Sequence, residues 1–276
     1  MITTLTAADW PRLKPLLDAN PAETIFLSSR IERYGLDAAQ LGCPVIGVVR
    51  GGDLVAAVHY GANLMAVGDV GSLGEVIERI GPRSRTMSIL GPAATVHALY
   101  TGLVQRWGNS WAQVRDMRAH QPLMVWHRSD PLGVAPDPRV VAVGMDQFEA
   151  YFRAAVSMYT EEVGVTPLDP SDSYRYYVRY LVQNRRAFGA SSNGHVWFKA
   201  DVGADYEAVC QLQGVWLDPA LRGKGLSEPL MAAVMWLLDA QWTTVSLYVN
   251  DFNMRARHMY QRLGFLEVGE LATVLY

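Results

Sequence analysis

The sequence predicts an α/β or α+β fold in which mixed sheets carry helices on both faces, arranged as two domains. Three observations support this. Short apolar runs typical of strands alternate with amphipathic helical segments along all 276 residues. Half of the residues are apolar and 18% are charged, so the chain can bury a substantial core. A proline-rich stretch near the middle separates two halves of ordinary domain size.

That stretch, "RSDPLGVAPDPRV", spans residues 128–140. Its prolines, with Asp and Gly between them, cannot sustain a helix or a strand, so it is typical of a linker. We therefore expect an N-terminal domain over residues 1–130, a linker over 131–138 and a C-terminal domain over 139–276.

The first half alternates helical and strand-like segments, and its clearest feature is a hairpin in which "GGD" separates two apolar runs. A proline opens the helix that follows the third strand. In order, we expect a helix over 6–20, hairpin strands over 45–50 and 54–61, a helix over 73–81, a strand over 88–91, a helix over 92–108, and strands over 112–118 and 122–128.

The second half repeats this order of elements without repeating the sequence, so a duplicated fold is a hypothesis at this point. The segment "MDQFEAYFRAAVSMYTEE", which follows the first strand of this half, is typical of an amphipathic helix. In order, we expect a strand over 139–144, helices over 145–162 and 173–187, strands over 195–203 and 208–217, a helix over 228–241, a strand over 244–250, a helix over 253–264 and a strand over 272–276.

Charge and cysteine content exclude several classes of function. A net charge of −3 gives no basic field for nucleic acid or anionic lipid. Cys43 and Cys210 lie far apart, and with the histidines they show no metal-ligand spacing. No apolar run approaches the roughly 20 residues of a membrane span, and the first residues lack a signal pattern. We expect a cytoplasmic, reduced protein without a metal.

A glycine turn between a strand and a helix is the most informative motif. "VWLDPALRGKGLSEPL", residues 215–230, follows an apolar strand and precedes apolar residues at helical spacing. Gly223 and Gly225 let the backbone approach a ligand, while Arg222 and Lys224 add positive charge. Free amides and the helix dipole converge there, which suits a phosphate or pyrophosphate.

Three nucleotide-binding patterns compete for this turn. A P-loop requires glycine at position 218, where Asp stands, and a dinucleotide fingerprint requires glycine at 228, where Glu stands. The coenzyme A pattern Arg/Gln-x-x-Gly-x-Gly/Ala fits residues 222–227 except at the last position, where Ser227 replaces Gly or Ala. Serine is small, so this departure is mild.

With this turn, residues 139–276 resemble the GNAT superfamily of N-acetyltransferases. The second signature of that family is matched in "VSLYVNDFNMRARHMYQRLGFLEVG", where Asn253, Ala256, Tyr260 and Gly264-Phe265 take the expected places. More narrowly, "MYTEEVGVTP" and the front half resemble an actinobacterial group of tandem GNAT-like proteins. The resemblance implies two GNAT-like domains, each a mixed, mostly antiparallel sheet flanked by helices.

The resemblance also implies the cofactor, acetyl-CoA, and the residues that hold it. The strand before the turn is expected to bind the pantetheine arm, and the turn is expected to hold the pyrophosphate. Asn253 caps the next helix, contacts the cofactor, or does both. The implied cofactor contacts are Val215, Trp216, Leu217, Arg222, Gly223, Lys224, Gly225, Leu226, Ser227, Glu228 and Asn253.

Tyr260 is the candidate general acid that protonates the departing thiolate, unless it is only a half-buried helix aromatic. The strand that carries a glutamate base in several relatives offers Tyr248 instead, so the base is unassigned. Glu161 and Glu162 are the candidates, Glu207 is a weaker one, and an ordered water or a merely solvated helix end are the alternatives.

We therefore expect an acetyl-CoA-dependent N-acetyltransferase in which a primary amine, on a small molecule or a peptide, attacks directly within a ternary complex. Neither cysteine has a neighbouring base that would favour an acyl-enzyme. The alternative is a non-catalytic acyl-CoA sensor or scaffold with the same fold. The first half lacks the coenzyme A pattern, so its role stays open among acceptor binding, regulation and a homodimer interface.

Overall fold

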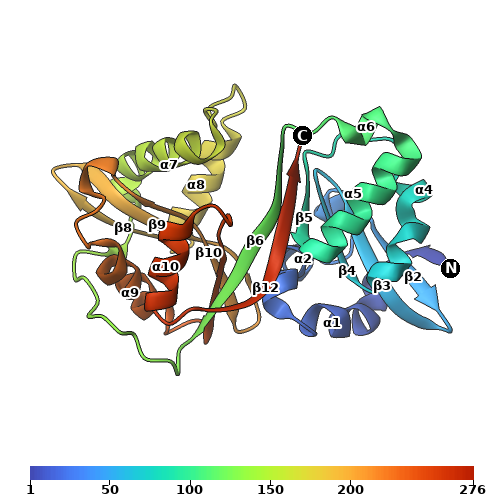
Figure 1. The fold of residues 1–276 in the computed structure, drawn as a ribbon, viewed down its shortest axis with the longest axis horizontal. Helices are drawn as coiled ribbons and strands as arrows, with labels where there is room; N and C mark the ends of the chain where they lie inside the picture. The colour runs from blue at the N-terminus through green and yellow to red at the C-terminus, as the bar shows by residue number, and fades with distance from the viewer. The chain divides into compact units, whose positions relative to one another are not determined.

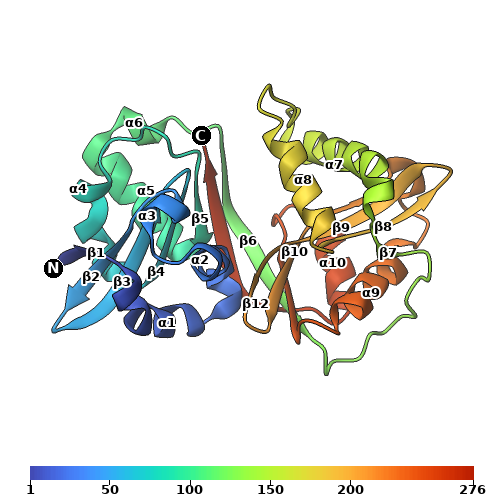
Figure 2. The same ribbon diagram turned by 180° about the vertical axis from the view of Figure 1, so that it is seen from behind.

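The computed structural model describes residues 1–276, which form an α/β protein of two compact units (Figures 1 and 2). The first unit comprises Met1–Leu123, Tyr248–Asn253 and Glu267–Tyr276. The second unit comprises Met124–Leu247 and Met254–Leu266. Each unit is described by itself.

The first unit is built on a mostly antiparallel sheet, with the strand order β1-β2-β3-β4-β5-β12-β6. Within it, β4 and β5 pair in parallel, whereas β12 pairs with β5 in the antiparallel sense. Its strands are β1 (Ile2–Thr4), β2 (Val45–Arg50), β3 (Asp53–Tyr60), β4 (Asn63–Gly68), β5 (Ser88–Pro92), β6 (Asp116–His127) and β12 (Leu266–Leu275). Its helices are η1 (Ala7–Asp9), α1 (Trp10–Asp18), α2 (Pro21–Tyr34), α3 (Ala38–Leu41), η2 (Val70–Val76), α4 (Ile77–Ile80), α5 (Ala93–Trp107) and α6 (Asn109–Ala112).

The second unit contains a sheet with the strand order β11-β10-β9-β8-β7, in which only β10 and β11 pair in parallel. Its strands are β7 (Val141–Ala142), β8 (Ala187–Ser192), β9 (His195–Tyr206), β10 (Val209–Leu217) and β11 (Thr244–Tyr248). Its helices are η3 (Met145–Gln147), α7 (Phe148–Val163), α8 (Ser173–Gln183), η4 (Pro219–Leu221), α9 (Ser227–Leu238) and α10 (Met254–Arg262).

Both units follow the same order of elements, as the sequence rhythm suggested. In each, two helices, followed in the first unit by the short α3, precede three antiparallel strands, a helical segment leads to a parallel strand, and another helix follows. The parallel pairs β4–β5 and β10–β11 occupy corresponding places. The predicted fold class, a mixed and mostly antiparallel sheet flanked by helices in each of two domains, is confirmed.

Several predicted elements were wrong in extent. The segments 112–118 and 122–128 form the single strand β6, which tolerates Pro122 because its carbonyl still accepts a hydrogen bond from the Val249 amide at 3.2 Å. The strand expected over 139–144 has only two residues, and α2 was missed altogether.

The last strand, β12, joins the first unit although it ends the chain. It pairs with β5 from Leu271↔Pro92 to Leu275↔Ser88, and burial of Leu271, Ala272 and Val274 fixes that register. The compact units therefore do not follow the division expected around 131–138. Residues 128–140 do lack helix and strand. The pairing of β12 with β5 joins residues that are far apart in the sequence, and local sequence patterns cannot predict such a pairing.

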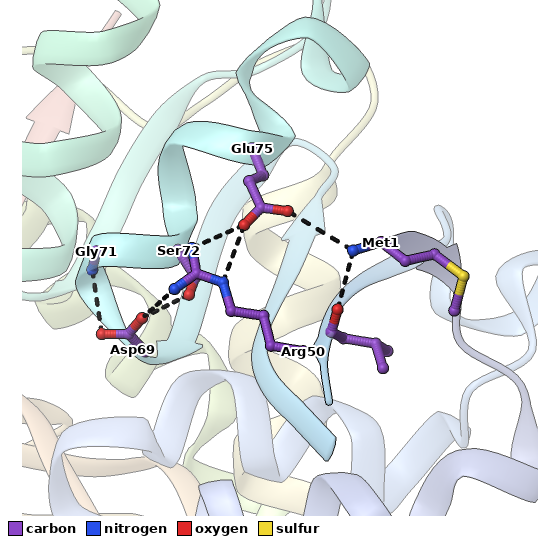
Figure 3. A network of polar contacts seen from close by, with 7 residues as sticks. Met1, Arg50, Asp69, Gly71, Ser72 and Glu75 are labelled. Atoms are coloured by element: carbon purple, nitrogen blue, oxygen red, sulfur yellow. Dashed lines mark hydrogen bonds and ion pairs between the residues drawn. The ribbon is translucent and has the colours of Figure 1, made fainter. Parts of the chain in front are cut away.

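A polar network joins the start of η2 to strand β2 in the first unit (Figure 3). Arg50 donates to Glu75 at 2.7 Å and lies 3.7 Å from Asp69, while the Ser72 hydroxyl and the Gly71 amide donate to Asp69. The charged members, Arg50, Asp69 and Glu75, are between 37% and 52% exposed, so their ion pairs add little to the stability of the fold.

Candidate functional site

The glycine turn connects β10 to α9 in the second unit, as the sequence predicted. After β10 ends at Leu217, the short helix η4 is followed by an exposed loop and by α9, which starts at Ser227. Gly223 and Gly225 have φ values of +77° and +72°, in the left-handed region that glycine adopts at least cost. Nothing lies within 4 Å of where a Cβ would stand on either glycine. The loop therefore leaves open space beside its backbone.

The N-terminus of α9 faces this loop and supplies a positive end. The amides of Ser227 and Glu228 lie in the first turn, where helical amides lack intrahelical partners, and Pro229 needs none. The helix is twelve residues long, so its dipole favours an anion at this end. Glu228 is held by Arg262 of α10, whose Nε lies 2.7 Å from Oε1. Lys224 is exposed on the loop.

Strand β10 leaves its parallel partner before it reaches the turn. Pairing with β11 runs from Val209↔Thr244 to Gln211↔Ser246, whereas β10 continues to Leu217. On the other side, the pairing with β9 shifts register between Gln213 and Trp216, which forms a bulge at Gly214, with φ +57°. The β10 edge beyond Gln211 thus offers backbone groups to an extended amide ligand.

Arg222 and Glu161 form a bidentate ion pair between the loop and the end of α7. Arg222 donates to both oxygens of Glu161, at 2.5 and 2.8 Å, and the Trp216 indole donates to Oε2 at 3.0 Å. The hydrogen bonds from Arg222 lower the pKa of Glu161 below its ordinary value. Both carboxylate oxygens accept hydrogen bonds from Arg222 or Trp216, so in this state Glu161 anchors Arg222 and its charge is already paired.

Glu161→Gln is expected to reduce the thermal stability of the protein at neutral pH and to have little effect on it at acidic pH. Because the folded pKa of Glu161 is lowered, its ion pair stabilises the protein above the ordinary pKa of 4.5 and is lost as pH falls through the folded value. Thermal denaturation of wild type and variant should therefore differ at pH 7 and converge near pH 3. A difference that is independent of pH would contradict the charge-based explanation.

Tyr260 lies buried on α10, with 6% of its surface exposed, and packs edge-on against Phe265 at 5.6 Å between ring centroids. Burial and then the negative charge of Glu162 raise the pKa of its phenol. The phenol is therefore protonated at neutral pH, as a general acid must be. Of the candidate catalytic carboxylates, Glu162 is the one whose charge acts on the Tyr260 phenol.

Two further predicted residues, Asn253 and Glu207, lie outside the glycine loop. Asn253 immediately precedes α10 but belongs to the first unit, and its backbone amide donates to Asn250 at 2.9 Å. Its role toward a cofactor stays a prediction. Glu207, the weaker base candidate, sits in the β9–β10 turn with φ +51°, at the end of β10 opposite the glycine loop.

Sequence reasoning missed four buried polar residues near the β10 bulge. Lys199 and Asp201 on β9, Tyr151 on α7 and Gln211 on β10 are all at most 4% exposed. Neither polar atom of the Gln211 amide has a hydrogen-bond partner within the protein. The available signal was the pair of charges two residues apart in the otherwise apolar "VWFKADV", since such a pair shares one strand face.

No helix in the structure is long and apolar enough to cross a membrane. No group of three or more His, Cys, Asp and Glu side chains is placed to hold a metal ion. Cys210 is buried, which raises the pKa of its thiol, and Cys43 is a partly buried free thiol.

Comparison with known families agrees with this geometry. Residues 148–265 match the acetyltransferase (GNAT) family, and residues 43–151 match a domain of unknown function, DUF4081. A mycothiol acetyltransferase from Rhodococcus erythropolis is 41% identical over 75 residues, which are 26% of this chain and 25% of that protein. The match thus spans about a quarter of the curated relative.

Solved structures share the fold over the whole chain. A GNAT-family acetyltransferase from Colwellia psychrerythraea gives a TM-score of 0.59 at 14% identity, covering 100% of this chain and 99% of that one. A tandem GNAT protein from the clavulanic acid biosynthesis pathway gives 0.55 at 14% identity, covering 99% and 97%.

The fold is thus shared with GNAT-family structures over the whole chain. Residues 148–265, which contain the glycine turn, form a GNAT-family domain, and residues 43–151 match the DUF4081 domain.

Proposed function

We propose that this protein is an N-acetyltransferase that uses acetyl-CoA and transfers the acetyl group to a primary amine. The observation that carries the proposal is the combination, in one compact unit, of an unpaired β10 edge and a glycine loop at the N-terminus of α9. An extended amide chain ending in a pyrophosphate complements both features. GNAT proteins use acetyl-CoA, which supports the choice of cofactor.

In the proposed complex the turn residues bind the pyrophosphate. Backbone amides from Gly223 to Glu228 face the phosphates, and Lys224 supplies charge. Arg222 adds its charge if the cofactor displaces Glu161 from its ion pair. The backbone of Val215, Trp216 and Leu217 binds the pantetheine arm, and Asn253 is a further predicted contact.

The chemistry is a direct attack of the amine on the thioester carbonyl. The C–N bond forms, the C–S bond breaks, and Tyr260 gives its proton to the departing thiolate. Glu162 is the preferred base for the incoming ammonium, because both oxygens of Glu161 are occupied and the charge of Glu162 already acts on Tyr260. Cys210 is fully buried, which supports a ternary complex rather than an acyl-enzyme.

The acceptor is a primary amine on a small molecule or a peptide. Neither nucleic acid nor a membrane is part of the proposal, and we place the reaction in the cytoplasm. A homodimer and the role of the first unit stay open.

A second function has two observations in its favour. The ion pair with Glu161 already neutralises Arg222, one of the two cations of the loop. In addition, β11 ends in Tyr248 at the position where several relatives carry a carboxylate base. Both features suit an acyl-CoA sensor that binds without turnover. Calorimetric titration with acetyl-CoA, followed by thiol release in the presence of a panel of primary amines, tests both functions. Binding with turnover supports the enzyme, binding without turnover supports the sensor, and no binding contradicts both.

A further inference from the structure

A buried charged cluster lies between α7 and the β9–β10 hairpin in the second unit. Lys199 is 0% exposed, and its Nζ donates to Oδ2 of Asp201 at 2.5 Å. The Tyr151 hydroxyl, also buried, donates to the other Asp201 oxygen and lies 3.2 Å from the Ala200 carbonyl. Lys199 also lies over the Tyr151 ring, 5.4 Å from its centroid. The Asp201 carboxylate and the Tyr151 ring therefore hold the Lys199 ammonium group in place.

The ammonium also binds the bulge of β10. Lys199 Nζ donates to the Gly214 carbonyl at 2.9 Å, and a Cβ on Gly214 would stand 2.7 Å from Nζ and 3.0 Å from Asp201 Oδ2. Gly214 has φ +57°, so its backbone is in a conformation that most residues avoid. The cluster is thus packed directly against the bulge that lies between Gln213 and Trp216 of β10.

A buried ion pair is weak evidence of a stabilising role. Burying an ion pair costs desolvation that its attraction often fails to recover, and apolar residues of similar volume can replace such pairs without loss of stability. The cluster nevertheless sits where β10 has left β11, at the strand that the proposed function assigns to the pantetheine arm. Its position indicates a task in the site rather than in the core.

The geometry of the peptide bond indicates how the cluster could act on a bound ligand. In a trans peptide, the carbonyl of one residue and the amide N–H of the next point in opposite directions within one plane. Anchoring the Gly214 carbonyl toward Lys199 therefore directs the Val215 N–H away from the Lys199 ammonium. A fixed amide of this kind stabilises negative charge that develops on a carbonyl oxygen.

We propose that Lys199, held by Asp201 and Tyr151, is a positioning residue that fixes the Gly214–Val215 peptide so that its N–H polarises the thioester carbonyl of the bound acyl-CoA. This inference rests on the proposed function and adds residues that act without touching the substrate. In this proposal the buried pair of Lys199 and Asp201 helps to activate the acyl group of the cofactor and has no role in binding the amine.

The test is a double variant, Lys199→Met with Asp201→Leu, because removing both charges leaves no unpaired ion in the core. Infrared spectra of bound [1-¹³C]acetyl-CoA report the thioester carbonyl stretch without any acceptor. In the wild type this band should shift to lower frequency on binding, and in the double variant most of that shift should be lost. Turnover with any amine found active should fall about tenfold or more, by analogy with lost carbonyl-stabilising donors. KM for acetyl-CoA should change little.

The control is Lys14→Met, which removes an exposed lysine paired with Asp18 at 2.9 Å in the first unit, and it should leave the band unchanged. If the double variant fails to fold, Tyr151→Phe removes one hydroxyl and should weaken the band shift in the same direction. If the folded double variant keeps the band shift of the wild type, the positioning role is overturned and the proposed function is not. The same conclusion follows from an unchanged band shift in Tyr151→Phe when that variant is the one tested. A wild-type protein that does not bind acetyl-CoA would overturn the proposed function, and the positioning role with it.

Discussion

Gly225→Glu should abolish binding of acetyl-CoA. A glutamate at this position projects a negative charge into the open space beside the loop, where the proposal places the pyrophosphate. It also forces a side chain onto a residue with φ +72°. If the wild type binds with micromolar affinity, about −8 kcal/mol, the variant should show no heat of binding at millimolar acetyl-CoA.

Two controls separate charge from backbone strain. Gly225→Ala imposes the left-handed conformation without the charge, at a cost of about 1–2 kcal/mol per residue, and should keep measurable affinity. Gly52→Glu, in the β2–β3 turn of the first unit, has φ +96° and open space around its Cβ position. It should bind acetyl-CoA as the wild type does. Retained affinity in Gly225→Glu would remove the pyrophosphate from this loop.

Tyr260→Phe should remove turnover and keep the cofactor. The phenol is buried and protonated, so the substitution deletes the proposed proton donor and leaves the ring packed on Phe265. Loss of a general acid lowers kcat by about 100-fold or more, whereas the calorimetric affinity for acetyl-CoA should change little. Thiol release and titration on the same preparation measure both.

Tyr276→Phe is the matched control. The Tyr276 hydroxyl is buried in the first unit without a hydrogen-bond partner in the protein, and burial raises the pKa of this phenol as well. Its removal should leave kcat and stability nearly unchanged. Because the pKa of Tyr260 is raised above the ordinary value of 10, wild-type kcat should show no decline from this residue below pH 10. Unchanged kcat in Tyr260→Phe would make Tyr260 a core residue only.

Local patterns were sufficient for elements whose signals are local. The hairpin of β2 and β3 follows from its glycine turn, and α9 follows from apolar spacing after a glycine loop. The loop itself could be predicted because glycine, a small residue and a helix start are properties of consecutive residues. Helix α2 was missed, and β6 was divided in two, because Pro21 and Pro122 resemble chain breaks. In the fold Pro21 opens a helix, and Pro122 lies in a strand position that needs no donor.

The candidate site divides in the same way. The sequence alone determined the glycine turn at residues 222–227, the second motif around Tyr260 and the order of elements, since each depends on spacing along the chain. Only the tertiary structure decided that Glu161 is held by Arg222, and that Lys199 and Asp201 are bound to the Gly214 bulge. It also decided that β12 pairs in the first unit. Those facts depend on contacts between residues 15 to 187 positions apart, for which the energy of burial and pairing, not local propensity, selects the partner.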